Sequence, residues 1–306
     1  MTVQPAPATS APTTDAGGLG AAEAITSAPP PRGRRRRPAV VLSSLFLAAT
    51  CLVMLSPFIW AALSSVKPTV VAFSNPPVFR FGPTFQPYVN LWQGTNFYLY
   101  LGNTLIVAVI STIVALAIGL PCAYALSRYG GIASIVLLVM ALIFRALPRF
   151  AVVLPMYEIS KTLGLYDTTY AMAAALIAIN QPFTIWLLRN FFSDIPTTLD
   201  EAAMMDGCSR FQTLRRVMLP LMGPGILTAG IFVFLFAFQE YLTATILTDV
   251  NARTVPVFIA TQLGQTLPML QQAGAAAVLF TIPAIAFAFI AQKYIVAGLS
   301  AGSVKG

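Results

Sequence analysis

Three ionisable side chains lie inside long apolar runs of the sequence, where charge is otherwise rare. Arg145 and Arg149 fall in the third of these runs, and Glu240 falls in the fifth. A charged group at membrane depth is costly, so such groups usually pair with one another or line the route of a solute. Their donors and acceptors suit a polar solute, and the two arginines also suit an anionic one.

The depth of these charges in their runs predicts how they pair. At 1.5 Å rise per residue, Arg145 lies about 20 Å and Glu240 about 24 Å from the starts of their helices. We therefore expect Glu240 to pair with Arg145, and Arg149 to lie nearer the outer mouth on the same helix face. The pair is either part of a pathway or purely structural. Gln239 joins these three residues as a candidate pathway residue.

No other constellation in the sequence suits catalysis. The chain has no histidine, and its three cysteines, Cys51, Cys122 and Cys208, suggest neither a disulfide nor a metal site. It has no Gly-x-x-x-x-Gly-Lys-Ser/Thr loop for a nucleotide. We expect no enzymatic activity, no cofactor and no bound ATP. The alternative of a membrane-embedded enzyme would have only the Arg145, Arg149 and Glu240 cluster as its site.

The elements that position these residues are predicted to be membrane-spanning helices. Of the 306 residues, 57% are hydrophobic and 9% are charged, whereas roughly a quarter are charged in soluble domains. Continuous apolar runs of about 20 residues predict an all-α integral membrane protein rather than a barrel of short alternating strands. Six spans are expected, at 39–63, 103–126, 132–154, 170–189, 224–247 and 273–292.

The basic residues predict how these spans are oriented. If six helices alternate, most basic residues fall on one side, and the other side holds Lys67, Arg80, Lys161 and Arg253. This asymmetry predicts cytoplasmic termini in a multi-pass protein of the cell membrane, and it explains the net charge of +8 without nucleic acid. Residues 1–38 are expected to be a disordered tail with a basic anchor, because they end in an arginine run and lack hydrophobic periodicity.

The segment 193–222, between the fourth and fifth spans, predicts a compact helix–turn–helix. Thr198 or Asp200 can cap a short helix that carries Glu201 in its first turn. Gly207 then allows a turn. A second helix is expected from about Arg210 to Met218, ended by Pro220. On the residues alone, an interfacial amphipathic helix pair explains this segment as well as a docking knob.

The spacing of this segment closely resembles a family motif. Glu201-Ala202-Ala203, three residues, Gly207, nine residues, Val217, one residue and Leu219-Pro220 follow the pattern of the EAA loop. That loop is typical of binding-protein-dependent ABC importer permeases, which usually have Ile where this sequence has Val217. The ending 298–306 resembles that of the carbohydrate, maltose-type (MalG-like) subfamily. The resemblance implies a six-helix domain at 39–297 and a cytoplasmic tail at 298–306.

The resemblance implies a function and a set of partners. In the family, the EAA helix couples the permease to its ATPase, and this role falls here on Glu201, Ala202, Ala203, Asp206 and Gly207. It implies a second permease subunit, two ATPase subunits that bind the ATP, and an external substrate-binding protein. The expected cargo is a sugar or polyol. A sugar phosphate is an alternative, because Arg145 and Arg149 could prefer an anionic solute. Phe238-Gln239-Glu240 departs from the Trp-Asn-Glu of many sugar permeases, so the resemblance does not identify the precise sugar. A self-sufficient secondary transporter would show internal repeats, which are not evident.

Overall fold

The computed structural model describes residues 38–72, 74–263 and 266–301, and within these ranges the regular structure is helical without strands. The chain divides into two compact units, Met1–Met54 and Leu55–Gly306. The described part of the first unit is the beginning of α1 (Pro38–Ser65). Its apolar side chains are exposed, Leu42 and Phe46 among them, as suits a helix that faces lipid or a partner.

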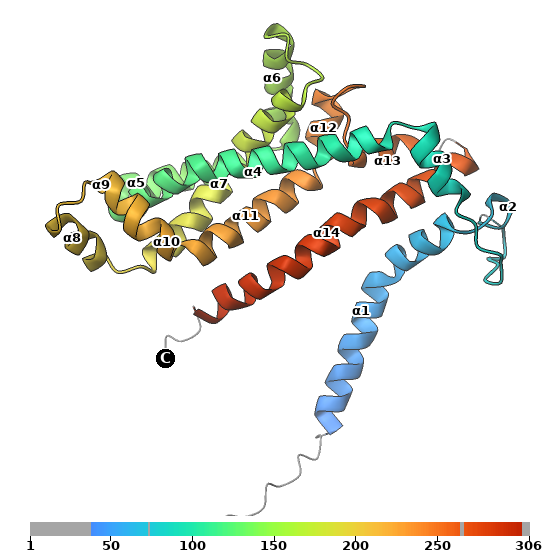
Figure 1. Ribbon diagram of the computed structural model, residues 1–306, viewed down its shortest axis with the longest axis horizontal. Coiled ribbons are helices and arrows are strands. Elements are labelled where there is room, and N and C mark those ends of the chain that lie inside the picture. Colours follow the sequence, from blue (N-terminus) through green and yellow to red (C-terminus); the bar gives the residue numbers. More distant parts are fainter. Residues whose placement is uncertain (1–37, 73, 264–265, 302–306) are drawn as a thin grey trace, which may run out of the picture. The chain divides into compact units, whose positions relative to one another are not determined.

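Four long helices of the second unit carry its core (Figure 1). They are α4 (Phe97–Arg128), α7 (Thr169–Ser193), α11 (Gly223–Phe238) and α14 (Leu267–Ala301). Helix α4 packs along α7 and α11, and α11 also packs on α14. Val107, Leu176 and Phe238 are buried where these helices meet. Parallel rings at 4.3 Å, Phe238 on Phe280, join α11 to α14.

Four helices in the described residues are long and apolar enough to cross a membrane: Val40–Ser65, Phe97–Arg128, Thr169–Ser193 and Leu267–Phe289. Two bent pairs, Ser134–Ala146 with Arg149–Thr162 and Arg210–Leu221 with Gly223–Phe238, raise this number to six if each is one span. The predicted all-α class is therefore confirmed. The count of six spans stays a prediction.

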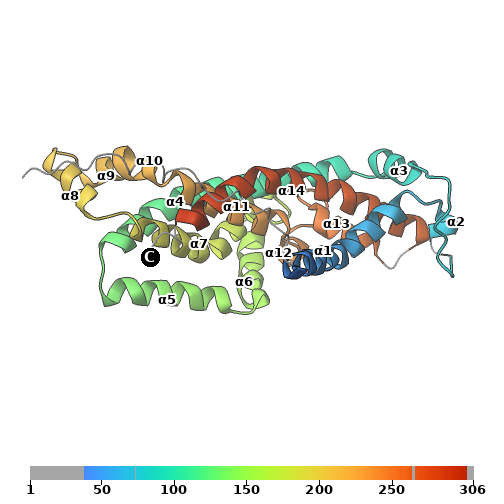
Figure 2. The same ribbon diagram turned by 90° about the horizontal axis from the view of Figure 1, so that it is seen from below.

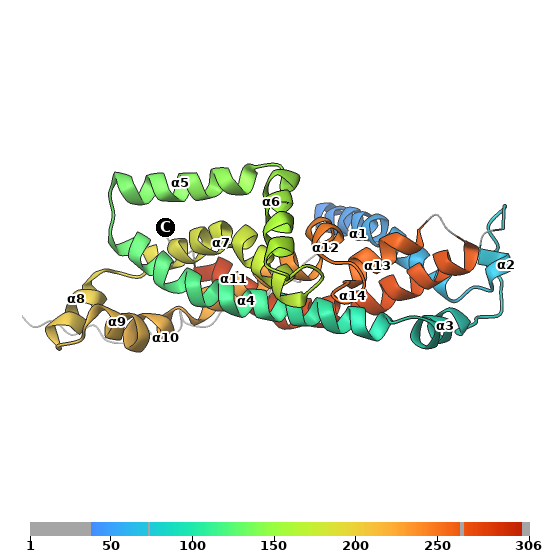
Figure 3. The same cartoon turned by 90° about the horizontal axis from the view of Figure 1, so that it is seen from above.

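The prediction of a continuous helix over 132–154 is wrong. Helix α5 (Ile132–Ala146) ends before Pro148, and α6 (Arg149–Thr162) leaves it at 88°; both views in Figures 2 and 3 show this corner. Proline disfavours helical backbone in the residue before it, and Leu147 is indeed extended, with ψ 146°. Arg145 and Arg149 consequently belong to different helices, so they share no helix face.

The prediction of a continuous helix over 224–247 is also wrong. Helix α11 ends at Phe238, and the short helix α12 (Leu242–Leu247) begins after three irregular residues. Glu240 Oε1 accepts hydrogen bonds from the backbone N–H and the hydroxyl of Thr243, at 3.0 and 2.8 Å. A side chain that satisfies local backbone donors competes with the regular helical ladder, and here it accompanies the break.

Other boundaries differ from expectation by several residues. Helix α4 begins at Phe97 rather than 103, and α14 runs from Leu267 to Ala301, so residues 298–301 continue a helix. Outside the motif segment, the other short helices are α2 (Thr69–Ala72), α3 (Gln86–Gly94) and α13 (Val255–Gln262). The predicted disorder at 1–37 and the end of the predicted tail, 302–306, lie outside the described residues.

Candidate functional site

The motif segment begins with α8 (Thr198–Met205). The predicted cap is wrong, because the N-cap residue is Thr197 and it makes no side-chain hydrogen bond. Asp200 and Glu201 both lie in the first turn, where negative charge favours the positive end of the helix dipole. Glu201 and Ala202 are exposed, whereas Ala203 is buried.

A complete Schellman motif ends α8 at Gly207. The N–H of Gly207 donates to Met204 O and the N–H of Cys208 donates to Ala203 O, each at 3.0 Å. Gly207 has φ +83°, a conformation that other residues adopt at a cost. No atom lies within 4 Å of the position that a Cβ would take. Backbone conformation, rather than space, therefore explains glycine here.

The second half of the segment is longer and less regular than predicted. Ser209 and Gln212 form a capping box at the start of α9 (Arg210–Thr213). A π-helical turn, η1 (Leu214–Met218), follows, and α10 (Leu219–Leu221) completes it. Pro220 lies inside α10 instead of ending the helix. The chain then turns by 80° into α11.

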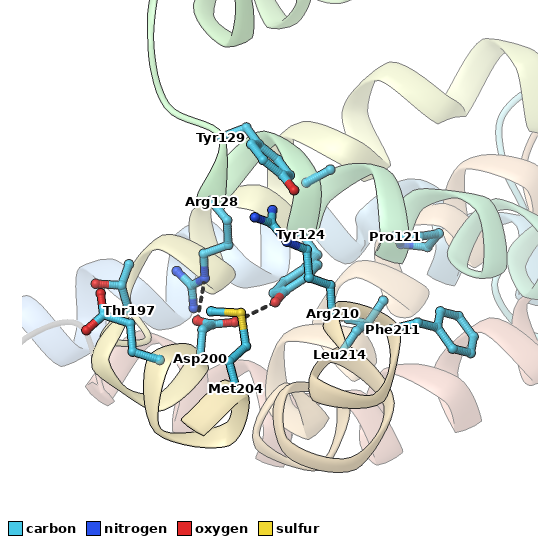
Figure 4. A pocket seen from close by; sticks show the side chains of 12 residues that line it. Pro121, Tyr124, Arg128, Tyr129, Thr197, Asp200, Met204, Arg210, Phe211 and Leu214 are labelled. Carbon is cyan, nitrogen blue, oxygen red and sulfur yellow. Dashed lines mark hydrogen bonds and ion pairs between the residues drawn. The ribbon is translucent and has the colours of Figure 1, made fainter. Parts of the chain in front are cut away.

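An ion pair attaches α8 to the end of α4 (Figure 4). Arg128 Nε lies 2.8 Å from Asp200 Oδ2, and Tyr124 Oη donates a hydrogen bond of 2.5 Å to Asp200 Oδ1. The side chains of Arg128 and Asp200 are only 11% and 8% exposed. Arg128 Nη1 also donates to Phe192 O at the end of α7. Sequence reasoning missed this cluster, because nothing in the sequence pairs Arg128 with a residue so distant along the chain.

A cavity of about 530 Å³ lies between the end of α4 and this segment. Tyr124, Tyr129, Met204 and Arg210 are among the side chains that line it, as Figure 4 shows. The guanidinium of Arg210 lies 4.8 Å from the ring centre of Tyr129. Two apolar side chains of the segment are strongly exposed: Met205 (88%) and Phe211 (70%), the latter at the edge of the cavity. Such exposed apolar side chains beside acidic ones are typical of a contact surface.

The candidate pathway residues meet at the two helix breaks, but in a different pairing from the one predicted. Arg149 Nη2 lies 3.7 Å from Glu240 Oε2. The predicted partner, Arg145, instead lies over the rings of Phe183 and Phe236, with its Cζ 4.8 and 5.0 Å from their centres. The break after α5 places Arg145 and Arg149 on different helices, and Arg149 is the one that reaches Glu240. Gln239 is the exposed residue that closes α11.

A second cluster that the sequence did not reveal joins two loops. The Asp167 carboxylate accepts hydrogen bonds from the backbone N–H groups of residues 249–252, at 2.7 to 3.2 Å, and from Asn251 Nδ2. Burial alone would raise the pKa of Asp167, but these four backbone donors lower it from 3.8 to about 2. Asp167 itself has φ +58°, in the left-handed region that non-glycine residues adopt rarely.

The geometry defines a helical membrane subunit whose exposed helix–turn–helix is attached firmly to its core. Residues 115–301 match the family described as "Binding-protein-dependent transport system inner membrane component". The chain belongs to this family, so it is a multi-pass membrane protein and a transport subunit rather than an enzyme.

Relatives and solved structures agree with this assignment. The chain is 38% identical to the probable ABC transporter permease protein y4oR of Sinorhizobium fredii over 86% of its length and 94% of the relative's. It is 36% identical to the trehalose transport system permease protein SugB of Mycobacterium tuberculosis, covering 82% and 93%. It is 34% identical to the trehalose/maltose transport system permease protein MalG of Thermococcus litoralis, covering 87% and 96%.

The fold is similar to that of a chain in a bacterial ABC transporter involved in the import of the acidic polysaccharide alginate. The TM-score is 0.69 at 24% identity, over 87% of this chain and 99% of that one. This likeness concerns the fold. The predicted resemblance to the permease family is confirmed.

Proposed function

We propose that this chain is a permease subunit of an ABC importer that moves a sugar or related polyol, driven by ATP hydrolysis on a separate subunit. The sequence relationship carries the proposal. The chain covers nearly the whole length of relatives named for trehalose and for trehalose/maltose transport. A sugar phosphate is the second candidate cargo, because Arg145 and Arg149 lie together in the membrane region.

The surface that receives the ATPase consists of Glu201, Ala202, Ala203, Asp206 and Gly207. Glu201, Ala202 and Asp206 are exposed on α8 and at its end, and they make the contacts. Buried Ala203 lets α8 lie close to its own chain, and Gly207 provides the turn that sets α9 beside it. Exposed Met205 and Phe211 add apolar contact area at the rim.

Movement of this surface is passed to the membrane helices through Asp200. Its ion pair with Arg128 and its hydrogen bond from Tyr124 join the first turn of α8 to the last turns of α4. Helix α4 in turn packs along α7 and α11. When ATP draws the ATPase dimer together, α8 and this helix group shift as a unit, and the pathway alternates between its two sides.

The segment that contains α8 faces the cytoplasm in this proposal, and so do both termini. Arg128, Arg210, Arg215 and Arg216 gather on this side, as the positive-inside rule requires. The loop that contains Asp167 then faces outward, toward the substrate-binding protein. The functional assembly comprises this chain, a second permease, two ATPase subunits and the external binding protein, within the cell membrane.

Purification of the tagged chain in mild detergent tests this function. Mass spectrometry of what accompanies it is expected to find a second permease and an ATPase with a phosphate-binding loop. The loaded binding protein should stimulate ATP hydrolysis by that complex. A chain that purifies alone and still transports or converts a solute would overturn the proposal.

A further inference from the structure

The corner between α5 and α6 carries more positive than negative charge. Arg145 and Arg149 lie on either side of the break, and Glu240 is the acidic side chain within ion-pair distance of Arg149. The other carboxylate oxygen of Glu240 already accepts two hydrogen bonds from Thr243. One positive charge therefore remains without a compensating carboxylate among the described residues at this corner. Uncompensated charge at membrane depth is costly.

The guanidinium of Arg145 is held in place, but not all of its hydrogen-bond donors have an acceptor. The faces of Phe183 and Phe236 fix its guanidinium at about 5 Å, and these rings pack edge to face on each other. Its Nη1 atom is buried and has no hydrogen-bond partner in the part of the chain that the structure describes. A buried charged donor without an acceptor is strongly unfavourable, so an incoming oxygen atom would be bound firmly here.

The beginning of α6 also favours a negatively charged ligand. Helix α6 has 14 residues, and its N-cap residue, Pro148, supplies no side-chain acceptor. The positive end of its dipole is therefore available to an anion. A cavity of about 260 Å³ lies against this end, lined by Arg145, Leu147, Arg149 and the apolar side chains of Phe144, Val152 and Ile179. A carboxylate, sulfonate or phosphate group fits in this volume.

We propose that this cavity is an anion subsite on the solute pathway, and that the transported solute is a sugar derivative with a carboxylate, sulfonate or phosphate group. Arg145 is the fixed donor, and Arg149 exchanges its long contact with Glu240 for the solute. Broken helices that meet at membrane depth are where transporters commonly bind their cargo. This inference rests on the proposed function and narrows its cargo.

Thermal unfolding of the assembled complex in phosphatidylcholine nanodiscs tests the subsite. Galacturonate and glucose 6-phosphate are the anionic probes, with galactose and glucose as matched neutral sugars at equal ionic strength. The anionic probes should raise the unfolding midpoint by about 2 °C or more, and the neutral sugars should not. Arg145→Gln and Arg149→Gln should each remove the shift, Arg145→Lys should weaken it, and Arg80→Gln, at an exposed arginine, should retain it.

Equal shifts with neutral and anionic sugars, no shift with either anion, or shifts that survive in both glutamine variants would overturn the subsite. A midpoint that rises with added phosphatidylglycerol, but not with galacturonate, would assign the anion to a lipid head group and also overturn it. If no ATPase copurifies, the proposed function fails. If the complex assembles and hydrolyses ATP yet binds both sugar types equally, only the charge preference fails.

Discussion

Arg128 at the end of α4 and Asp200 in the first turn of α8 form an ion pair of 2.8 Å that is almost fully enclosed. Neither residue belongs to the family motif that the sequence displays. Removing one partner of a buried pair leaves the other charge uncompensated, at a cost of about 3–5 kcal/mol when burial is complete. The pair therefore holds α8 to α4, the helix that α8 moves in the proposed coupling.

Replacing Asp200 by alanine should separate ATP hydrolysis from transport. We expect ATP hydrolysis to continue, because Glu201 and Ala202, the proposed contacts with the ATPase, remain exposed, while uptake falls about tenfold or more. Uptake of the solute carried by the associated binding protein and the ATPase rate of the purified complex measure this. Tyr124→Phe removes one hydrogen bond and should cost only about 1 kcal/mol of stability, with a small loss of uptake.

A charge exchange provides the matched control for the ion pair. The double variant Arg128→Asp with Asp200→Arg should recover part of the coupling that Asp200→Ala loses. If Asp200→Ala transports normally with a normal ATPase rate, the ion pair has no part in coupling.

The positive φ at Gly207 decides which residue types the turn tolerates at this position. Gly207→Asn should retain most transport, because Asn adopts positive φ readily. Gly207→Ala should destabilise the turn by about 1–2 kcal/mol, and Gly207→Trp should abolish uptake by also obstructing the ATPase, while membrane insertion stays normal. Uptake assays and the abundance of the membrane-inserted chain distinguish these outcomes. Normal uptake by Gly207→Trp would contradict the assigned role.

Glu240→Gln tests whether the ion pair of Glu240 with Arg149 takes part in the solute pathway or is purely structural. Glutamine retains an acceptor for Thr243 but loses the charge that faces Arg149. The contact is long, and the Arg149 side chain is 41% exposed, so its loss should change stability by less than about 1 kcal/mol. Uptake should nevertheless change severalfold. Unchanged uptake with unchanged abundance would exclude Glu240 from the mechanism.

Asp167 should make stability depend on acid pH. Its pKa is about 2 in the folded chain and 3.8 when unfolded, so its contribution is complete above about pH 4 and is lost as the pH falls toward 2. After allowance for solvent screening, this contribution is roughly 1–2 kcal/mol. Asp167→Asn should lower the unfolding midpoint at pH 6 and show less further loss on acidification. Parallel curves for both proteins would contradict the assignment.

The sequence predicts the helices well and the breaks within them poorly. Apolar runs locate all the long helices, because burial in lipid depends on composition alone. The break before Pro148 had a signal in that proline, but a proline inside an apolar run is also compatible with an unbroken helix, as Pro121 and Pro182 demonstrate. The break at Glu240 had no comparable signal.

For the candidate site, the motif predicts α8 and its turn because the residues act locally. Glu201 at the helix start and Gly207 at its end are recognisable from their spacing alone. Arg128 with Asp200 and Asp167 with residues 249–252 depend on tertiary contacts between distant segments, so no local pattern reveals them. The exchange of Arg145 for Arg149 as the partner of Glu240 followed directly from the undetected break.

The nine-residue interval of the motif, between Gly207 and Val217, runs into the π-helical turn at Leu214–Met218. A π turn accommodates one more residue than an α turn over a similar rise. Deleting one residue here would therefore let the chain form an ordinary α-helix, with its length almost preserved. A π turn and an α turn each sweep about one full turn, so everything beyond the deletion would also keep nearly the same orientation against α8. A one-residue deletion in this turn should thus be tolerated better than one within α8, where the residues beyond the deletion would rotate by about 100°.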